Sequence, residues 1–128
     1  MEEKQRIVVL DDDEVFAALI TADLEADYNV AVGLNGLEGL RLCLAARTDL
    51  LITDIGMPEL DGIQMLKEFQ KDQRLSRIPV IVMTATHFNT RSRSDVERYP
   101  QVRGIMSKTS DVVDQIILEV RKVLQKPA

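Results

Sequence analysis

Five side chains with acidic, hydroxyl or basic groups stand at the ends of apolar runs of this chain. Two carboxylates follow the run Ile7–Leu10, a third follows Leu50–Ile52, and a hydroxyl and an amine follow two later runs. The five residues are Asp11, Asp12, Asp54, Thr84 and Lys108. Because the carboxyl ends of parallel strands open on one edge of a sheet, we expect these side chains to gather in one crevice.

Three carboxylates in one crevice repel each other, and a divalent cation relieves that repulsion. Mg²⁺ is held by one or two carboxylates, waters and phosphate oxygens. A nearby lysine and a threonine hydroxyl supply a positive charge and a donor for a phosphoryl group in transfer. A carboxylate can accept that group as an aspartyl-phosphate. Since these positions offer no cysteine, no serine–histidine pair and no glycine-rich phosphate loop, Asp54 is the best candidate nucleophile.

Apolar strand-like runs alternate with helical patterns along the whole chain, which is typical of βαβ units and a parallel sheet. The expected strands are Ile7–Leu10, Asn29–Val32, the run beginning at Leu50, Pro79–Met83 and Val102–Met106. Five helices alternate with them. We therefore predict a doubly wound α/β domain covering residues 1–128, with a five-stranded parallel sheet in the order 2-1-3-4-5.

Polar residues mark the expected starts of the helices. The predicted caps are Asp12 or Asp13, an Asn35–Glu38 capping box, Asp61, and a Ser94–Glu97 capping box. Pro100 limits the fourth helix to about two turns. The expected buried stripes are Phe16, Leu19, Ile20 and Leu24 in the first helix, and Leu37, Leu40 and Leu44 in the second.

The composition is that of one soluble globular domain. The chain has 128 residues, of which 45% are hydrophobic and 29% charged. Its net charge of −5 argues against direct nucleic-acid binding, which needs a basic face. A single cysteine excludes an internal disulfide. Neither a signal peptide nor a membrane-spanning run is present, so we expect a cytoplasmic protein without membrane contact.

Four runs of the chain, taken together and in order, resemble the receiver domain of two-component response regulators of the chemotaxis-regulator type. They are VVLDDDE, LLITDIGMPELDG, VIVMTA and IMSK. The pattern D-x-x-M-P-x-x-D-G is specific, whereas each of the other runs alone is weak. The resemblance implies the flavodoxin-like receiver fold and a signalling switch that catalyses only its own phosphorylation and dephosphorylation.

The resemblance also implies a role for each site residue. Asp54 would be the phosphoacceptor, and Thr84 and Lys108 would contact the phosphoryl group. The implied Mg²⁺ ligands are Asp11, Asp12, Asp54 and the backbone carbonyl of Gly56. The phosphodonor would be a phosphohistidine of a histidine kinase or a histidine phosphotransfer protein. A downstream partner or output domain would bind the face formed by the fourth helix, fifth strand and fifth helix.

Two positions depart from the family pattern. Ile105 stands where the family usually has the aromatic switch residue that acts with Thr84. Thr109 replaces the usual proline after Lys108, so we predict a trans Lys108–Thr109 bond, because a non-proline cis bond costs about 2.5–4 kcal/mol. These departures keep open a receiver that acts as a scaffold without productive phosphorylation.

Two other classes of protein are weaker alternatives. A metal-dependent phosphohydrolase of the haloacid-dehalogenase type needs a second acid two residues after its nucleophile, where Gly56 stands. A flavodoxin-like nucleotide or flavin binder needs a phosphate loop after the first strand, where Asp11–Glu14 stands. Because the chain ends soon after the last helix, we expect either a free-standing receiver or the receiver of a larger regulator or hybrid kinase.

Overall fold

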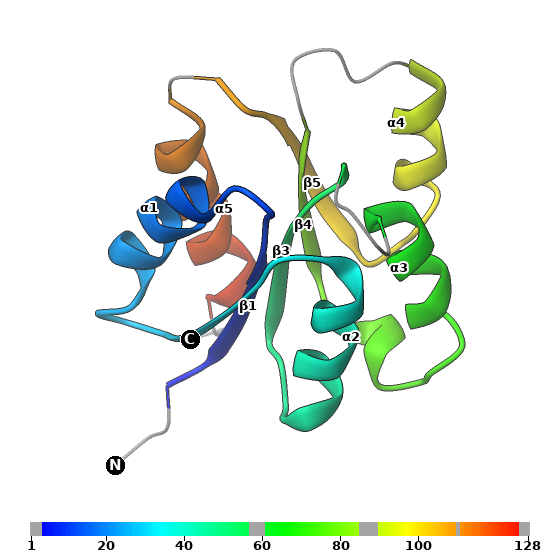
Figure 1. Ribbon diagram of the computed structural model, residues 1–128, viewed down its shortest axis with the longest axis horizontal. Coiled ribbons are helices and arrows are strands. Elements are labelled where there is room, and N and C mark those ends of the chain that lie inside the picture. Colours follow the sequence, from blue (N-terminus) through cyan, green and yellow to red (C-terminus); the bar gives the residue numbers. More distant parts are fainter. Residues whose placement is uncertain (1–3, 57–60, 85–89, 110, 126–128) are drawn as a thin grey trace.

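Five parallel strands form one sheet in the order β2-β1-β3-β4-β5, as predicted (Figure 1). The computed structural model describes residues 4–56, 61–84, 90–109 and 111–125, without the side chains of residues 90–92. The strands are β1 (Arg6–Leu10), β2 (Asn29–Gly33), β3 (Leu50–Asp54), β4 (Val80–Thr84) and β5 (Val102–Ser107). The helices are α1 (Glu14–Leu24), α2 (Gly36–Ala45), α3 (Gly62–Phe69), α4 (Thr90–Glu97) and α5 (Val112–Leu124), and a short 3₁₀ helix, η1 (Leu75–Arg77), precedes β4.

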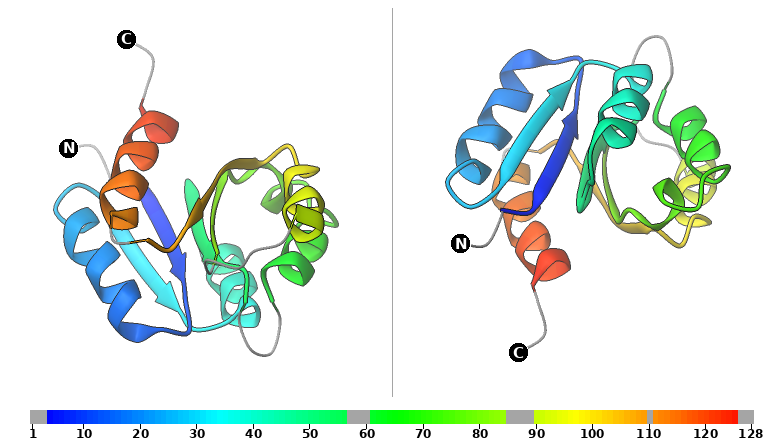
Figure 2. Two further views of the ribbon diagram at one scale, coloured as in Figure 1. Left: turned by 90° about the horizontal axis from the view of Figure 1, so that it is seen from above. Right: turned by 90° about the horizontal axis from the view of Figure 1, so that it is seen from below.

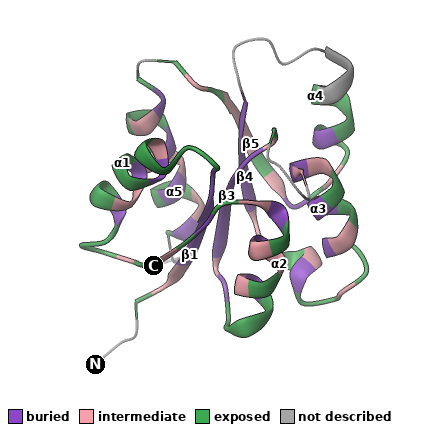
Figure 3. Ribbon diagram, in the orientation of Figure 1, coloured by how far each residue is buried: buried purple, intermediate pink, exposed green. Residues whose placement is uncertain are grey.

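Helices cover both faces of the sheet. Helices α1 and α5 lie on one face, and α2, α3 and α4 lie on the other (Figure 2). Successive residues of β1 alternate between the two faces: Ile7 and Val9 belong to the core under α1 and α5, whereas Val8 and Leu10 belong to the core under α2 and α3. The central strands are therefore buried on both sides, which Figure 3 shows as continuous purple along β1, β3 and β4.

Three of the four predicted helix caps are confirmed. The Asp13 carboxylate accepts the N–H groups of Val15 and Phe16 at the start of α1. Asn35 caps α2 by accepting the N–H of Glu38, but the Glu38 carboxylate accepts the N–H of Leu34 instead of that of Asn35, so the predicted capping box is only half formed. Asp61 forms a reciprocal capping box with Gln64 at the start of α3.

The Ser94–Glu97 capping box is wrong, because α4 already begins at Thr90 and Ser94 lies inside the helix. The helix still has only eight residues, in agreement with the short helix expected before Pro100.

Two predicted apolar stripes are partly wrong. In α1 the buried side chains are Ala17, Ile20 and Leu24, while Leu19 is 54% exposed. In α2 the leucines at positions 37 and 44 are exposed, and the buried positions are Gly36, Gly39 and Cys43.

Close packing explains which residues of α2 are buried. A Cβ atom added at Gly39 would overlap a methyl carbon of Leu10. Small residues let this helix approach the sheet, and Leu37 and Leu44 are turned outward, while Leu40 and Leu42 are half-buried against the core. Within the described ranges, no helix combines the length and the apolar character that crossing a bilayer requires.

Candidate functional site

Three carboxylates meet at the carboxyl rim of the sheet, where β1 and β3 are neighbours. Asp11 follows β1 directly, and Asp54 is the last residue of β3, with 8% of its surface exposed. Asp12 is exposed beside them. One carboxylate oxygen from each of the three lies within 4.8 Å of the others. The rim expected from the strand ends is thus formed, at the point where the strand order reverses.

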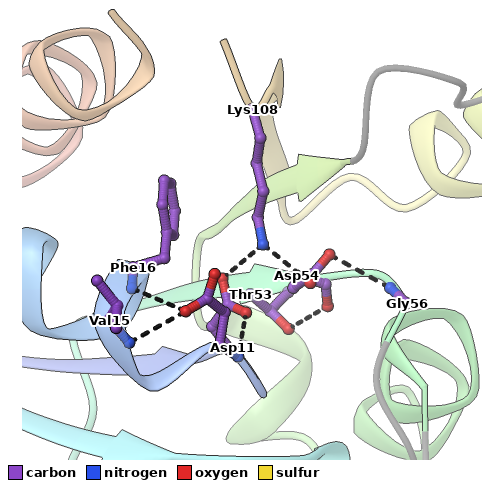
Figure 4. Close-up of polar contacts among 8 residues, drawn as sticks. Asp11, Val15, Phe16, Thr53, Asp54, Gly56 and Lys108 are labelled. Carbon is purple, nitrogen blue, oxygen red and sulfur yellow. Dashed lines mark hydrogen bonds and ion pairs between the residues drawn. The ribbon is translucent and has the colours of Figure 1, made fainter. Parts of the chain in front are cut away.

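Lys108 reaches this cluster from the loop after β5. Its Nζ lies 2.8 Å from Oδ2 of Asp11 and donates a hydrogen bond to Oδ2 of Asp54 over 3.1 Å (Figure 4). The backbone N–H of Lys108 donates to the carbonyl of Thr84 over 2.8 Å, which ties the loop to the end of β4. Partial burial lowers the pKa of Lys108, but the two carboxylates outweigh it and the net pKa is raised.

Asp11 is fully buried, and its two oxygens have different surroundings. Oδ1 accepts the backbone N–H of Asp13 over 2.9 Å. Oδ2 has the ion pair with Lys108, but among the described residues no group donates a hydrogen bond of good geometry to it. Burial raises the pKa of Asp11, and Lys108 and the Asp13 amide offset this only in part.

The carboxylate of Asp54 is held between two donors. Lys108 binds Oδ2, and the N–H of Gly56 donates to Oδ1 over 3.3 Å. The Thr53 hydroxyl donates to the backbone carbonyl of Asp54 and fixes the end of the strand.

Of the remaining predicted residues, Thr84 and Gly56 contact the site through the backbone, and Ile105 packs in the core. Thr84 is buried at the end of β4, opposite Ser107 of β5, and its contact with Lys108 runs through the backbone. Ile105 is half-buried, pairs with Val82 and packs into the core on the α2–α3–α4 side. Gly56 contributes its N–H to Asp54, and its exposed position leaves space around Cα. Met57, Pro58 and Ala85 of the motifs lie outside the described residues.

The sequence did not predict an aromatic contact that the structure shows at the site. Nζ of Lys108 lies 4.7 Å from the centroid of the Phe16 ring, on the first turn of α1 (Figure 4). The sequence offered only an apolar residue at helical spacing, and that pattern predicts core packing rather than contact with a charged group.

The donor set fits a hard divalent cation. All three side chains of the cluster offer carboxylate oxygens, the ligands that Mg²⁺ prefers. The buried Oδ2 of Asp11, which lacks a hydrogen bond within the described part of the chain, is an oxygen that a cation would satisfy. The residues present therefore agree with the predicted metal.

Sequence comparison decides the family. The response regulator receiver domain family matches residues 7–116. The chain belongs to this family of two-component signalling proteins. As a receiver domain it resembles the DNA-binding dual master transcriptional regulator RpaA of Synechocystis sp., with 33% identity over 81 residues. That match covers 62% of this chain and 34% of the relative.

A further relative and a solved structure are also similar to this chain. The polar-differentiation response regulator DivK of Brucella anthropi is 36% identical over 80 residues, covering 62% of this chain and 65% of DivK. The receiver domain of a sensor histidine kinase from Pseudomonas aeruginosa, solved with a magnesium ion coordinated in its active site cleft, has the same fold. Its TM-score is 0.82 at 21% identity, with 96% of this chain and 99% of that chain covered.

Proposed function

We propose that this receiver domain accepts a phosphoryl group on Asp54 in a Mg²⁺-dependent reaction. The donor is a phosphohistidine of a histidine kinase or a histidine phosphotransfer protein. The observation that carries the proposal is the placement of Asp54: it lies among Asp11, Asp12 and Lys108, at the rim of the sheet and with its carboxylate held by two donors. A carboxylate oxygen of Asp54 bonds to phosphorus as the bond from phosphorus to the donor's imidazole nitrogen breaks, and the nitrogen keeps the electron pair.

The groups that would hold Mg²⁺ are Asp11, Asp12, Asp54 and the backbone carbonyl of Gly56. When bound, the ion supplies positive charge that stabilises the phosphoryl oxygens. Lys108 supplies a second positive charge, because its raised pKa keeps the ammonium protonated at neutral pH. The Thr84 hydroxyl would donate to a phosphoryl oxygen on Asp54. In support, the related Pseudomonas aeruginosa domain carries magnesium in its active site cleft.

The proposed output surface is the face formed by α4, β5 and α5, which would bind a downstream protein or an output domain. The strand on this face is only partly buried along its length. The switch acts through Thr84 and Ile105. With isoleucine at position 105, we propose that the signal reaches this face by a change in packing around Val96 and Tyr99, which share the core of Ile105. The domain is a signalling switch of the cytoplasm, and its own phosphorylation and dephosphorylation are the reactions it catalyses.

Acetyl phosphate tests the phosphorylation without a cognate kinase. The purified protein is incubated with acetyl phosphate and Mg²⁺ and analysed by intact mass. We expect one added phosphoryl group that is acid-stable and base-labile, absent with EDTA and absent in Asp54→Asn. Asp49→Asn is the matched control, because Asp49 precedes the other end of the same strand and its Oδ2 accepts the N–H of Arg6. Labelling that persists in Asp54→Asn, or that needs no metal, would contradict the assignment.

The two alternative functions have distinct outcomes in the same assay. A scaffold receiver would remain unlabelled at every donor concentration while still binding its partners. A phosphohydrolase would turn over acetyl phosphate or an added phosphomonoester many times per protein without accumulating a labelled form. Stoichiometric labelling followed by slow loss is the result expected for a receiver.

A further inference from the structure

Phe16 is a side chain at the site that the proposed chemistry does not use. Its ring centroid is 4.7 Å from Nζ of Lys108, a distance at which the negative face of an aromatic ring attracts a cation. The ring is half-buried and packs against the core under α1 and α5. It therefore joins the apolar interior to the charged rim.

A closed set of contacts fixes the ring relative to the carboxylates. The backbone N–H of Phe16 donates to Oδ1 of Asp13 over 3.2 Å, and the N–H of Asp13 donates to Oδ1 of Asp11 over 2.9 Å. Asp11 in turn forms the ion pair with Lys108. The ring thus stands on the same turn that orients Asp11, and the cation it contacts is the cation that Asp11 and Asp54 share (Figure 4).

Lys108 needs such a support. Its stem is long and has many rotamers, and its side chain is 22% exposed. The loop that carries it is tied to β4 by the backbone bond to Thr84, which places Cα but leaves the side chain free to turn. The carboxylates attract the ammonium but do not limit the directions from which it approaches. A flat ring that packs against the core beside the ammonium does limit them.

We propose that Phe16 is a positioning residue for Lys108: the face of its ring holds the ammonium above Asp11 and Asp54, and thereby sets the rate at which Asp54 is phosphorylated. This inference rests on the proposed function, because it concerns the same site. The aromatic side chain with this role lies on α1, whereas the position on β5 that the family usually gives to an aromatic residue is Ile105.

Nuclear magnetic resonance tests the contact independently of phosphorylation. In the unmodified protein we expect the ε-methylene protons of Lys108 to be shifted upfield by the ring current of Phe16. We also expect nuclear Overhauser contacts from these protons to the ring and to the β-methylene of Asp54. Phe16→Leu keeps an apolar side chain of similar size and should lose both the shift and the contact to Asp54. Phe16→Tyr retains the ring and should keep both.

The rate of phosphorylation by acetyl phosphate tests the consequence. A cation–π contact at a partly exposed site contributes about 0.5–1 kcal/mol, which corresponds to about a two- to fivefold change in rate. We expect Phe16→Leu to lower the maximal rate by this factor with little change in the donor concentration at half-maximal rate. Phe16→Tyr should restore the rate. Val15→Ala, at an exposed neighbouring position, is the matched control.

Each outcome decides the inference. Equal slowing in Phe16→Leu and Phe16→Tyr would show a packing effect and overturn it, as would an unchanged rate in Phe16→Leu. If the wild-type protein takes no label, the proposed function fails, and the resonance experiment alone then decides whether Phe16 positions Lys108. Loss of the Lys108–Asp54 contact in Phe16→Leu supports positioning in that case, and its retention refutes it.

Discussion

Replacing Lys108 by methionine keeps an unbranched stem and removes the ammonium that lies between Asp11 and Asp54. The ion pairs that disappear are 2.8 Å and 3.1 Å long, and one of the acidic partners is fully buried. Removing one partner of a buried pair costs about 3–5 kcal/mol, because the remaining charge is left uncompensated. Lys108 is partly exposed and Asp11 can take up a proton, so we expect the free energy of unfolding to fall by about 3 kcal/mol, near the lower limit of this range.

Urea unfolding at pH 7 in EDTA measures this loss. Mg²⁺ should then restore more stability to Lys108→Met than it adds to the wild-type protein, because the wild-type ammonium already compensates the carboxylates that the ion would bind. A ligand at 100 times its dissociation constant adds about 2.7 kcal/mol to the free energy of unfolding. Equal stability of the two proteins in EDTA, or an equal gain in Mg²⁺, would refute the view that Lys108 compensates this cluster.

The pH dependence supplies a second check on the same variant. The pKa of Asp11 in the folded protein is raised above its ordinary value of 3.8, chiefly by burial. At pH values between the ordinary pKa and the raised pKa of Asp11, the folded state binds more protons than the unfolded state. In this range Asp11 therefore makes the protein less stable as the pH rises. Lys108 lowers the pKa of Asp11, so methionine at position 108 should raise it further. The stability gap between the two proteins should therefore narrow as the pH falls from 7 toward 4.

Three further predictions concern the core that supports the site. Burial raises the pKa of Cys43 from 9.0 to about 11, so the thiol should react slowly with a disulfide reagent at pH 8. The free energy of unfolding should fall by up to about 3 kcal/mol between pH 9 and 11, because the unfolded state loses this proton first. Gly39→Ala places a methyl group where it overlaps the Leu10 side chain of β1, so the free energy of unfolding should fall by about 1–2 kcal/mol in urea. Gly104→Ala, whose added methyl group has its nearest neighbour at 3.7 Å, should lower it less. Gln101→Leu removes the donor to two buried carbonyls and should cost about 1–3 kcal/mol in urea unfolding, with Gln73→Leu on the exposed surface as the control.

Local patterns in the sequence were sufficient for the strands and for most helix starts. The run Ile7–Leu10 contains only apolar residues, and a strand covered by helices on both faces requires that composition. Asp13, Asn35 and Asp61 act through bonds to residues two or three positions away, so their roles are visible in short stretches. Ser94 failed as a cap because the same spacing also occurs inside a helix, where no local signal distinguishes it.

The orientation of the helices was not determined by such patterns. Leu19, Leu37 and Leu44 have helical spacing and are exposed, because the buried stripe depends on which side of the helix meets the sheet. Helix α2 faces the sheet with Gly39 and Cys43. The spacing of the leucines around them therefore predicted the wrong buried stripe.

The sequence by itself determined which acidic, hydroxyl and basic side chains lie at the carboxyl edge of the sheet, because parallel strands place their carboxyl ends together whatever the details of packing. Tertiary structure alone decided how those residues share charge. The ion pairs of Lys108 with Asp11 and Asp54 and the ring of Phe16 beside the ammonium all join segments far apart in the chain. Such contacts depend on distances of a few ångströms and on burial, and only the packed fold fixes these.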